Sequence, residues 1–284
     1  MANPFVGYGL TLITFYLTGS KATKFKSGIK AQLETHPTPR DGKKRDVTSG
    51  NRNAIQVVCN SATGVVACLA FRILNAGLGD VDPLGKQVLK VVGGVRVSNL
   101  MLTLMVGGHY AACMGDTLGS ELGILSKSQP RLITSPWRSV PKGTNGAISP
   151  LGLFVSALGG TLIGTIQSLC LFAHYHYFST NQTSPSNCWK GYAKLIALLT
   201  ASGLFGSLVD SLLGATLQQT LYNEKSKKIL VGTAVDVRDG YKSHDATAQW
   251  VKVTGCNVLD NNAVNFLASA SAALTTAWIG VKLF

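Results

Sequence analysis

Most of this chain consists of apolar stretches that are long enough to cross a lipid bilayer as helices. A bilayer core of about 30 Å requires about 20 residues of α-helix, because each residue adds about 1.5 Å. Six apolar stretches, the first of them short, lie at residues 4–18, 54–76, 100–124, 148–178, 191–218 and 262–284. Only 14% of the 284 residues are charged, whereas about 25% is usual in soluble domains. The sequence therefore predicts an all-α multi-pass membrane protein of about six transmembrane helices, in which residues 1–284 form a single integral membrane domain.

The loops between these stretches differ in positive charge, and this difference predicts how the chain crosses the membrane. Nine, four and six Lys or Arg residues lie in loops 19–53, 125–147 and 219–261. Only three and one lie in the alternate loops, 77–99 and 179–190. Because Lys and Arg accumulate in cytoplasmic loops, we expect the three basic loops on the cytoplasmic side and both chain ends on the other side.

Loop 219–261 is long enough to carry structure of its own. Residues 229–237 and 248–254 alternate in part between apolar and polar side chains, which is typical of strands. The residues between them include Asp239 and Gly240, which favour a turn. We therefore expect a small β-hairpin on the cytoplasmic face.

Three carboxylates lie within the apolar stretches, at Asp116, Glu121 and Asp210. Ionised groups at membrane depth are costly, so they normally face a partner, a cavity or an ion. The chain carries 26 basic and 13 acidic residues, so acidic groups are scarce. Three of them nevertheless lie in apolar stretches, where an ionised side chain costs the most free energy. We take Asp116, Glu121 and Asp210 as candidate catalytic residues and as ligands of a Mg²⁺ ion, since hard cations prefer converging oxygen ligands.

The convergence of these carboxylates requires an irregular helix. Glu121 lies five positions after Asp116, which places the two about 140° apart around a regular α-helix. The glycines at positions 115, 119 and 123 make a break or unwinding plausible. The alternative is that each carboxylate pairs with an intramembrane cation, for which only Arg72 and Lys194 stand near the helices.

A glycine-rich stretch at residues 140–149 precedes the fourth apolar stretch and could hold phosphate groups. Glycines let backbone N–H groups approach an anion, a helix N-terminus adds a favourable dipole, and Lys142 adds positive charge. The alternative is an ordinary turn between a loop and a helix. The candidate phosphate-binding or nucleotide-binding residues are Lys142, Gly143, Thr144, Asn145, Gly146, Arg52 and Lys24.

Polar side chains near the ends of several apolar stretches could form a wall of the same site. Gln56 and Asn60 follow Arg52 at intervals of four residues, which puts all three along one stripe of a helix. Hydrogen bonds between helices and helix capping are the alternatives for such residues. The candidate wall residues are Gln56, Asn60, Ser120, Asn261, Asn262 and Asn265.

All of these polar groups gather at the cytoplasmic ends of the predicted helices, next to an apolar interior. Carboxylates suit Mg²⁺, cationic and N–H groups suit phosphates, and an apolar wall suits a lipid. Phosphoryl transfer depends on positioning and charge neutralisation and needs no covalent nucleophile. The residues therefore favour phosphoryl transfer to a lipid phosphate, with membrane lipids around the protein. Nucleic acid is not an expected partner, because the positive charge follows the topology rather than one face of a domain.

Four motifs in order along the chain resemble a known membrane family. They are GDTLGSELG at 115–123, VPKGTNGAIS at 140–149, GLFGSLVDSLLGATLQ at 203–218 and LDNNAVN at 259–265. Residues 20–26 and 50–60 also look like it. The family is the one of eukaryotic transmembrane protein 19 and plant phytyl-phosphate kinase, which carries domain of unknown function 92. It usually has further helices before the motif at 20–26, so the natural chain could begin earlier than this one.

The resemblance implies a membrane kinase that transfers a phosphoryl group from a nucleoside triphosphate, CTP or ATP, to an isoprenoid monophosphate of the phytyl or prenyl type. The product would be the diphosphate. The resemblance also implies that Asp116, Glu121, Asn145 and Asp210 belong to the active site, and it suggests the endoplasmic reticulum as the membrane. Two alternatives remain open: a CTP-dependent nucleotidyltransferase acting on a lipid phosphate, and an ion-coupled membrane transporter whose carboxylates bind the ion.

Overall fold

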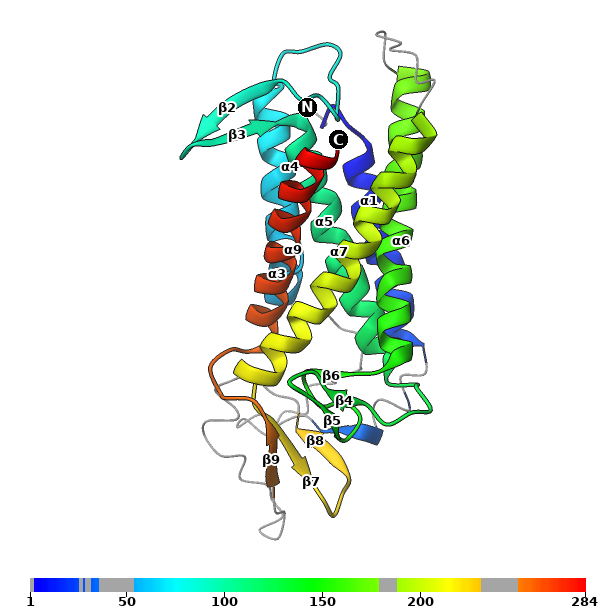
Figure 1. The fold of residues 1–284 in the computed structure, drawn as a ribbon, viewed down its shortest axis with the longest axis vertical. Helices are drawn as coiled ribbons and strands as arrows, with labels where there is room; N and C mark the ends of the chain where they lie inside the picture. The colour runs from blue at the N-terminus through cyan, green and yellow to red at the C-terminus, as the bar shows by residue number, and fades with distance from the viewer. Residues whose placement is uncertain (1–2, 26–27, 29–31, 36–53, 179–187, 231–249) are drawn as a thin grey trace.

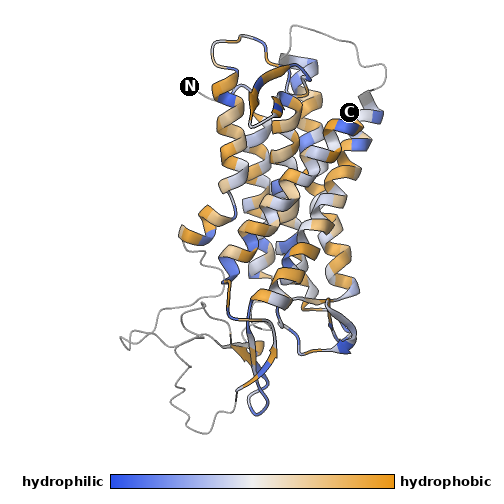
Figure 2. Ribbon diagram, turned by 60° about the vertical axis from the view of Figure 1, so that its left-hand side comes forward, coloured by the Kyte–Doolittle hydropathy of each residue, from blue (hydrophilic) through white to orange (hydrophobic). Residues whose placement is uncertain are grey.

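The protein is a bundle of long helices with small β-sheets at its two ends (Figure 1). The computed structural model describes residues 3–25, 28, 32–35, 54–178, 188–230 and 250–284. Both chain termini lie at one end of the bundle, together with the β2–β3 hairpin, and the other sheets lie at the opposite end, which we call the sheet end. Apolar residues cover much of the helices along the bundle (Figure 2).

Each of the six predicted apolar stretches contains a helix, so this part of the prediction is confirmed. The helices are α1 (Gly7–Lys24), α3 (Ala54–Cys59), α4 (Ala62–Leu74), α5 (Asn99–Gly123), α6 (Pro150–Ala173), α7 (Cys188–Leu217) and α9 (Asn261–Leu283). The second stretch is divided into α3 and α4, and α6 continues into a π-helical turn, η1 (His174–Phe178). By length and composition, three helical segments of the described chain could cross a membrane: Pro150–Tyr177, Trp189–Leu217 and Asn261–Leu283. Six crossings therefore stay a prediction.

Side chains at the helix N-termini fix where three of these helices begin. The Ser98 hydroxyl accepts a hydrogen bond from the Met101 backbone N–H at the start of α5. Ser149 caps α6 in the same way, with Pro150 in the first turn, and the Asp260 carboxylate caps α9. Such caps satisfy N–H groups that have no partner within the helix.

Helix α5 lies at the centre of the bundle and packs against α1, α4, α6, α7 and α9. Glycines allow the closest of these contacts: a Cβ atom on Gly159 of α6 would lie 2.8 Å from the backbone nitrogen of Gly115 on α5. The predicted break of this helix at its glycines is wrong, because α5 runs without interruption from Asn99 to Gly123. Its glycines serve close packing instead, as small residues do in membrane bundles.

Between α4 and α5 the chain forms a two-stranded antiparallel hairpin, β2 (Val88–Val92) and β3 (Val95–Ser98). Its two-residue turn, Gly93 and Gly94, has φ angles of 55° and 81°. Positive φ at both central residues suits a hairpin turn and is available to glycine at little cost. This hairpin was not predicted.

Two more sheets cover the sheet end of the bundle. One has the order β5-β4-β6 and consists of β4 (Arg131–Leu132), β5 (Ser135–Ser139) and β6 (Ala147–Ile148). The other has the order β1-β8-β7-β9 and consists of β1 (Glu34–Thr35), β7 (Thr220–Asn223), β8 (Lys228–Leu230) and β9 (Trp250–Thr254).

Strands do form within loop 219–261, but not in the predicted pairing. Strands β8 and β9 both pair antiparallel with β7, which lies between them. The β7–β8 turn is held by Asn223, whose side-chain oxygen accepts hydrogen bonds from the backbone N–H groups of Lys225 and Ser226. This early turn takes β8 back onto β7. The turn predicted around Asp239 and Gly240 lies outside the described residues.

Candidate functional site

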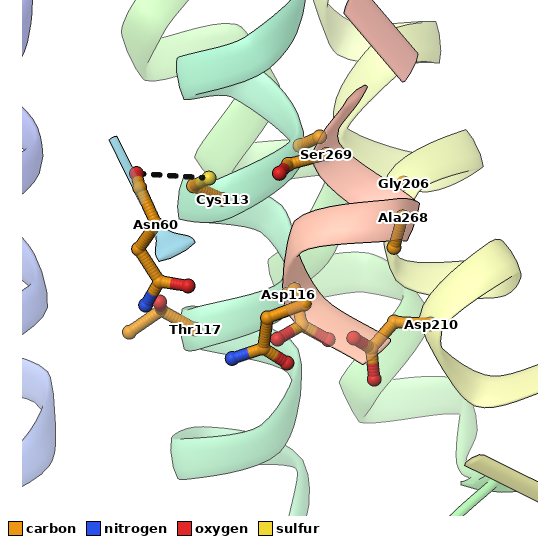
Figure 3. Close-up of a pocket in the computed structure, with 10 residues that line it drawn as sticks. Asn60, Cys113, Asp116, Thr117, Gly206, Asp210, Ala268 and Ser269 are labelled. Atoms are coloured by element: carbon orange, nitrogen blue, oxygen red, sulfur yellow. Dashed lines mark hydrogen bonds between the residues drawn. The ribbon is translucent and has the colours of Figure 1, made fainter. Parts of the chain in front are cut away.

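A small polar pocket near the sheet end of the bundle brings two carboxylates together, those of Asp116 and Asp210 (Figure 3). Its volume is about 20 Å³, which is room for a water molecule or a bare metal ion but not for a nucleotide. The lining residues are Asn60, Ala112, Cys113, Asp116, Thr117, Gly206, Asp210, Asn265, Ala268 and Ser269.

The polar groups of the pocket come from four separate segments of the chain. Asp116 lies two turns before the end of α5, and Asp210 lies two turns before the end of α7. Asn265 belongs to the second turn of α9, and Asn60 lies in the short break between α3 and α4. The pocket therefore exists only when these helices are packed together.

Neither carboxylate is neutralised by a neighbouring cation in the part of the chain that the structure describes. No Lys, Arg or His lines the pocket, and no described basic residue forms a salt bridge with Asp116 or Asp210. Arg72 lies in the last turn of α4, and Lys194 lies in the second turn of α7, about 24 Å along the helix axis from Asp210. The alternative of intramembrane ion pairs with these two cations is therefore not what the structure shows.

Asn265 holds one of the two carboxylates in place. With its amide oriented so that the nitrogen faces the acceptors, Asn265 Nδ2 donates to Asp210 Oδ2 at 2.9 Å and to the Asn261 backbone oxygen at 3.2 Å. A hydrogen bond to a carboxylate is stronger than one between neutral groups. Asn265, predicted as a wall residue, thus lines the pocket and positions Asp210.

The far wall of the pocket is built around the backbone oxygen of Asn60. His109 Nε2 lies 3.1 Å from this oxygen, and the Cys113 thiol donates to it at 3.6 Å. Figure 3 shows Cys113 and Thr117 on α5 above and beside Asp116. The residues His109, Cys113, Thr117 and Ser269 are not among the predicted site residues. The spacing of residues 109, 113, 116 and 117 along one helical stripe was a signal that could have found the first three.

Glu121 does not line the pocket with the two aspartates, although it interacts electrostatically with Asp116, and the predicted three-carboxylate metal site is not formed in the described residues. It is not among the residues that line the pocket, and no group of three or more His, Cys, Asp or Glu side chains in the described segments could hold a metal ion. The reason is the regularity of α5, because a continuous helix keeps the separation of about 140° between Asp116 and Glu121.

Ser120 is not a wall residue either. Its hydroxyl donates to the backbone oxygens of Asp116, at 2.9 Å, and Thr117, at 3.2 Å. Hydroxyls one turn along a helix commonly make this bond to their own backbone. Ser120 is therefore engaged with α5 itself.

The glycine-rich stretch forms a turn whose polar groups mostly bind the protein. The Lys142 ammonium donates to the Ser126 backbone oxygen at 2.6 Å. The N–H and hydroxyl of Thr144 both donate to the Pro141 oxygen, and the Asn145 N–H donates to the Thr220 hydroxyl. The ordinary-turn alternative therefore describes these residues, and none of them lines the pocket.

This turn nevertheless packs against the helix that carries Asp210. Gly146 has a φ angle of 75°, and a Cβ atom there would lie 2.5 Å from the Ser211 backbone oxygen and would overlap the Ala215 side chain. Gly143 has a φ angle of 90°, and a Cβ atom there would lie 3.4 Å from Ile229 Cδ1 of β8. Glycine at position 146 lets the loop rest on α7 one turn beyond the pocket, whereas Gly143 faces β8.

The remaining candidates that the structure describes lie outside the pocket. Lys24 is exposed in the last turn of α1, and Gln56 lies on α3. Asn261 and Asn262 form the first turn of α9, where the Asn261 backbone oxygen accepts the bond from Asn265. Arg52 lies outside the described residues.

The donor set fits a single hard cation better than a metal cluster. Mg²⁺ is usually held by one or two carboxylates, with water and substrate phosphates completing its coordination. Asp116 and Asp210 supply two carboxylates from different helices, and the Asn60 side chain adds an amide oxygen at the same pocket. Because the pocket holds no more than a small ion or a water, phosphate groups would have to bind at its mouth.

Known proteins resemble this chain, one of them over nearly its whole length. The family model described as integral membrane protein DUF92 matches residues 1–273. Protein PGR of Arabidopsis thaliana is 32% identical over 280 residues, which cover 98% of this chain and 83% of that protein. An uncharacterized membrane protein of Methanocaldococcus jannaschii is 39% identical over 109 residues, or 38% of this chain and 37% of the relative. No solved structure matches the chain.

Proposed function

Because the chain belongs to the DUF92 family of integral membrane proteins, we propose that its half-buried carboxylate pair, Asp116 and Asp210, serves a membrane kinase. The reaction transfers the terminal phosphoryl group of a nucleoside triphosphate, CTP or ATP, to an isoprenoid monophosphate of the phytyl or prenyl type. The observation that carries the proposal is the approach of Asp116 and Asp210 from separate helices to one pocket without a cation among its lining residues.

The negative charges of two ionised carboxylates at membrane depth require a positive charge nearby. A carboxylate pair that the described protein does not neutralise suits a divalent cation. Asp116 and Asp210 are the residues that would hold Mg²⁺, and the amide oxygen of Asn60 would face it. When bound, Mg²⁺ neutralises charge on the phosphate groups that meet there.

The proposed reaction is a direct phosphoryl transfer between the two substrates. An oxygen of the lipid monophosphate attacks the terminal phosphorus of the nucleotide, the bond to the nucleoside diphosphate breaks, and the lipid leaves as a diphosphate. A phosphomonoester is already largely dianionic at neutral pH, with a second pKa of about 6, so no general base is required. The isoprenoid class rests on the resemblance to the family of plant phytyl-phosphate kinase.

The pocket lies close to the sheet end of the bundle, and this end carries most of the described basic loops. Arg131, Arg138 and Lys142 lie in and around the β5-β4-β6 sheet, and Lys225, Lys227, Lys228 and Lys252 lie in and around the other sheet. Such loops are typical of the cytoplasmic side. We therefore place the site and the sheet end on the cytoplasmic side, where nucleotides are available, in a membrane such as the endoplasmic reticulum.

The test is an assay of the purified protein with Mg²⁺, a nucleoside triphosphate and tritiated prenyl monophosphates of several chain lengths. We expect a prenyl diphosphate and a nucleoside diphosphate as products. Asp116→Asn and Asp210→Asn should abolish the reaction while leaving the melting temperature close to that of the wild type. Glu224→Gln, which removes an exposed carboxylate from the β7–β8 turn, is the matched control and should keep full activity.

Product analysis separates this proposal from the two other candidates. Pyrophosphate in place of the nucleoside diphosphate would indicate a CTP-dependent nucleotidyltransferase. The break between α3 and α4 at the pocket favours an ion-coupled carrier as the second candidate, because carriers often bind ions at interrupted helices. Substrate flux into liposomes without either product would favour that carrier and reject the kinase.

A further inference from the structure

The β2–β3 hairpin ends in an apolar tip that no other part of the described chain covers. Val91, Val92 and Val95 around the glycine turn are 59%, 56% and 51% exposed. A two-stranded hairpin is at best marginally stable in water, and contiguous exposed apolar residues commonly mark a binding surface. The tip, residues 91–95, therefore requires a partner that accepts valine side chains.

Two cations stand directly behind this tip, one on each face of the hairpin. Val91 pairs with Arg96, and Lys90 pairs with Val97. Because the two residues of a cross-strand pair share a face and successive pairs alternate, Lys90 and Arg96 point to opposite faces. Both side chains are exposed, and neither forms a salt bridge with a described residue. The apolar tip suits the lipid acyl chains, and the two cations behind it suit the lipid phosphate groups. The hairpin therefore complements the boundary between these two layers of a bilayer.

The position of the hairpin in the fold puts it at that boundary. Strand β3 ends at Ser98, the residue that caps α5, so the hairpin is anchored at the end of a central helix. It projects sideways from the bundle, whereas β7 and β9 extend beyond the helix ends, along the bundle axis (Figure 1). A sideways projection from the end of a membrane bundle runs along the bilayer surface rather than into water.

We propose that the tip of the β2–β3 hairpin inserts into the surrounding lipid bilayer at the end of the bundle where both termini lie, with Lys90 and Arg96 binding lipid phosphate groups. The hairpin thereby anchors α5, the central helix, at a fixed depth. This interaction is independent of the carboxylate pocket and of the chemistry proposed for it.

A photo-reactive benzophenone side chain at position 92 tests the insertion in proteoliposomes. Position 251 is the matched control, because Val251 is a valine of similar exposure, 45%, in β9 at the sheet end. We expect mass spectrometry to find a phospholipid adduct at position 92 and little or none at position 251. A cross-linked dimer at position 92 would show that a second copy of the chain covers the tip, and equal lipid labelling at both positions would show no specific insertion. Either result would overturn the proposal.

A second measurement tests the two cations. The melting temperature of the protein is compared between nanodiscs of phosphatidylcholine and nanodiscs that also contain anionic phosphatidylglycerol. The wild type should be stabilised by the anionic lipid, and Lys90→Glu combined with Arg96→Glu should lose most of that shift. The matched variant, Lys225→Glu combined with Lys252→Glu at the sheet end, should keep it. An undiminished shift in the hairpin variant would contradict phosphate binding by Lys90 and Arg96.

Discussion

Gly115 of α5 and Gly203 of α7 lie back to back, so close that a Cβ atom on Gly115 would stand 2.5 Å from the Gly203 backbone oxygen. Each glycine precedes a carboxylate of the pocket. Asp116 follows Gly115 directly, and Asp210 follows Gly203 after two helical turns. The close contact of two backbones therefore sets how near the two carboxylates come to each other.

Gly115→Ala should destabilise the bundle and separate the carboxylates. The added methyl group has no space, and overpacking of this kind typically costs about 1–3 kcal/mol. We expect a lower melting temperature in detergent and a loss of Mg²⁺-dependent activity. Gly9→Ala is the control, because no atom lies within 4 Å of a Cβ atom at this exposed position of α1. That variant should be as stable as the wild type or slightly more stable, since alanine favours helix. An unchanged melting temperature for Gly115→Ala would show that the two backbones can separate without cost.

The position of Glu121 outside the pocket predicts that the acidic residues of α5 are not equivalent. Asp116→Asn removes a candidate cation ligand and should lower kcat/KM by on the order of 100-fold or more, equivalent to a few kcal/mol. Glu121→Gln leaves the pocket intact, so its activity should stay within a few fold of the wild type. Rates measured over a range of Mg²⁺ concentrations provide the comparison. Equal losses in both variants would mean that α5 unwinds in the working enzyme and brings Glu121 to the metal.

The hydrogen bond from Asn265 to Asp210 predicts an effect on cation affinity rather than on folding. Asn265→Leu keeps the side-chain volume but removes the donor, and the loss of such a supporting bond typically weakens metal binding about 10–100-fold. The Mg²⁺ concentration that gives half-maximal activity should therefore rise. Asn262→Leu, three residues earlier on α9 and outside the pocket, is the control. Added Mg²⁺ without substrates should also raise the melting temperature less in Asn265→Leu than in Asn262→Leu.

Hydrophobic patterning predicted the helices because length and apolar character are local properties of the chain. All six stretches contain helices, and Asp116 and Asp210 line one pocket. The role of Gly115 was not predictable in the same way. A glycine in a helix can mark a break or a close contact, and the choice depends on Gly203, which lies 88 positions away in the sequence.

The same limit applies to the predictions at the loops. The β7–β8 turn depends on the Asn223 side chain, which accepts hydrogen bonds from the N–H groups of Lys225 and Ser226. Alternation of apolar and polar residues predicts strands at 229–237 and 248–254 but does not specify their partner. The glycine-rich stretch resembled an anion site, but Thr144 and Asn145 use their N–H groups within the fold. Whether an N–H group is available to a ligand depends on partners that the local sequence does not specify.

The last prediction concerns His109, which supports the break between α3 and α4. Because a backbone oxygen can only accept, His109 Nε2 must carry the proton and donate to Asn60. His109→Leu leaves that oxygen without this donor inside the bundle, at a typical cost of about 1–3 kcal/mol. The melting temperature should fall, and the Asn60 side chain should lose its fixed position at the pocket. His109→Gln, which keeps an N–H donor, should recover part of the stability.

Gly64 provides an independent check on the same contact. A Cβ atom on Gly64, one turn beyond Asn60, would lie 2.7 Å from the His109 ring carbon Cδ2. Gly64→Ala should therefore push the imidazole away from the Asn60 oxygen and lower the melting temperature even though the histidine remains. In the double variant Gly64→Ala/His109→Leu the two losses should be less than additive, because both act on one hydrogen bond. Fully additive losses would show that the two substitutions act independently and do not share the contact between His109 and the Asn60 oxygen.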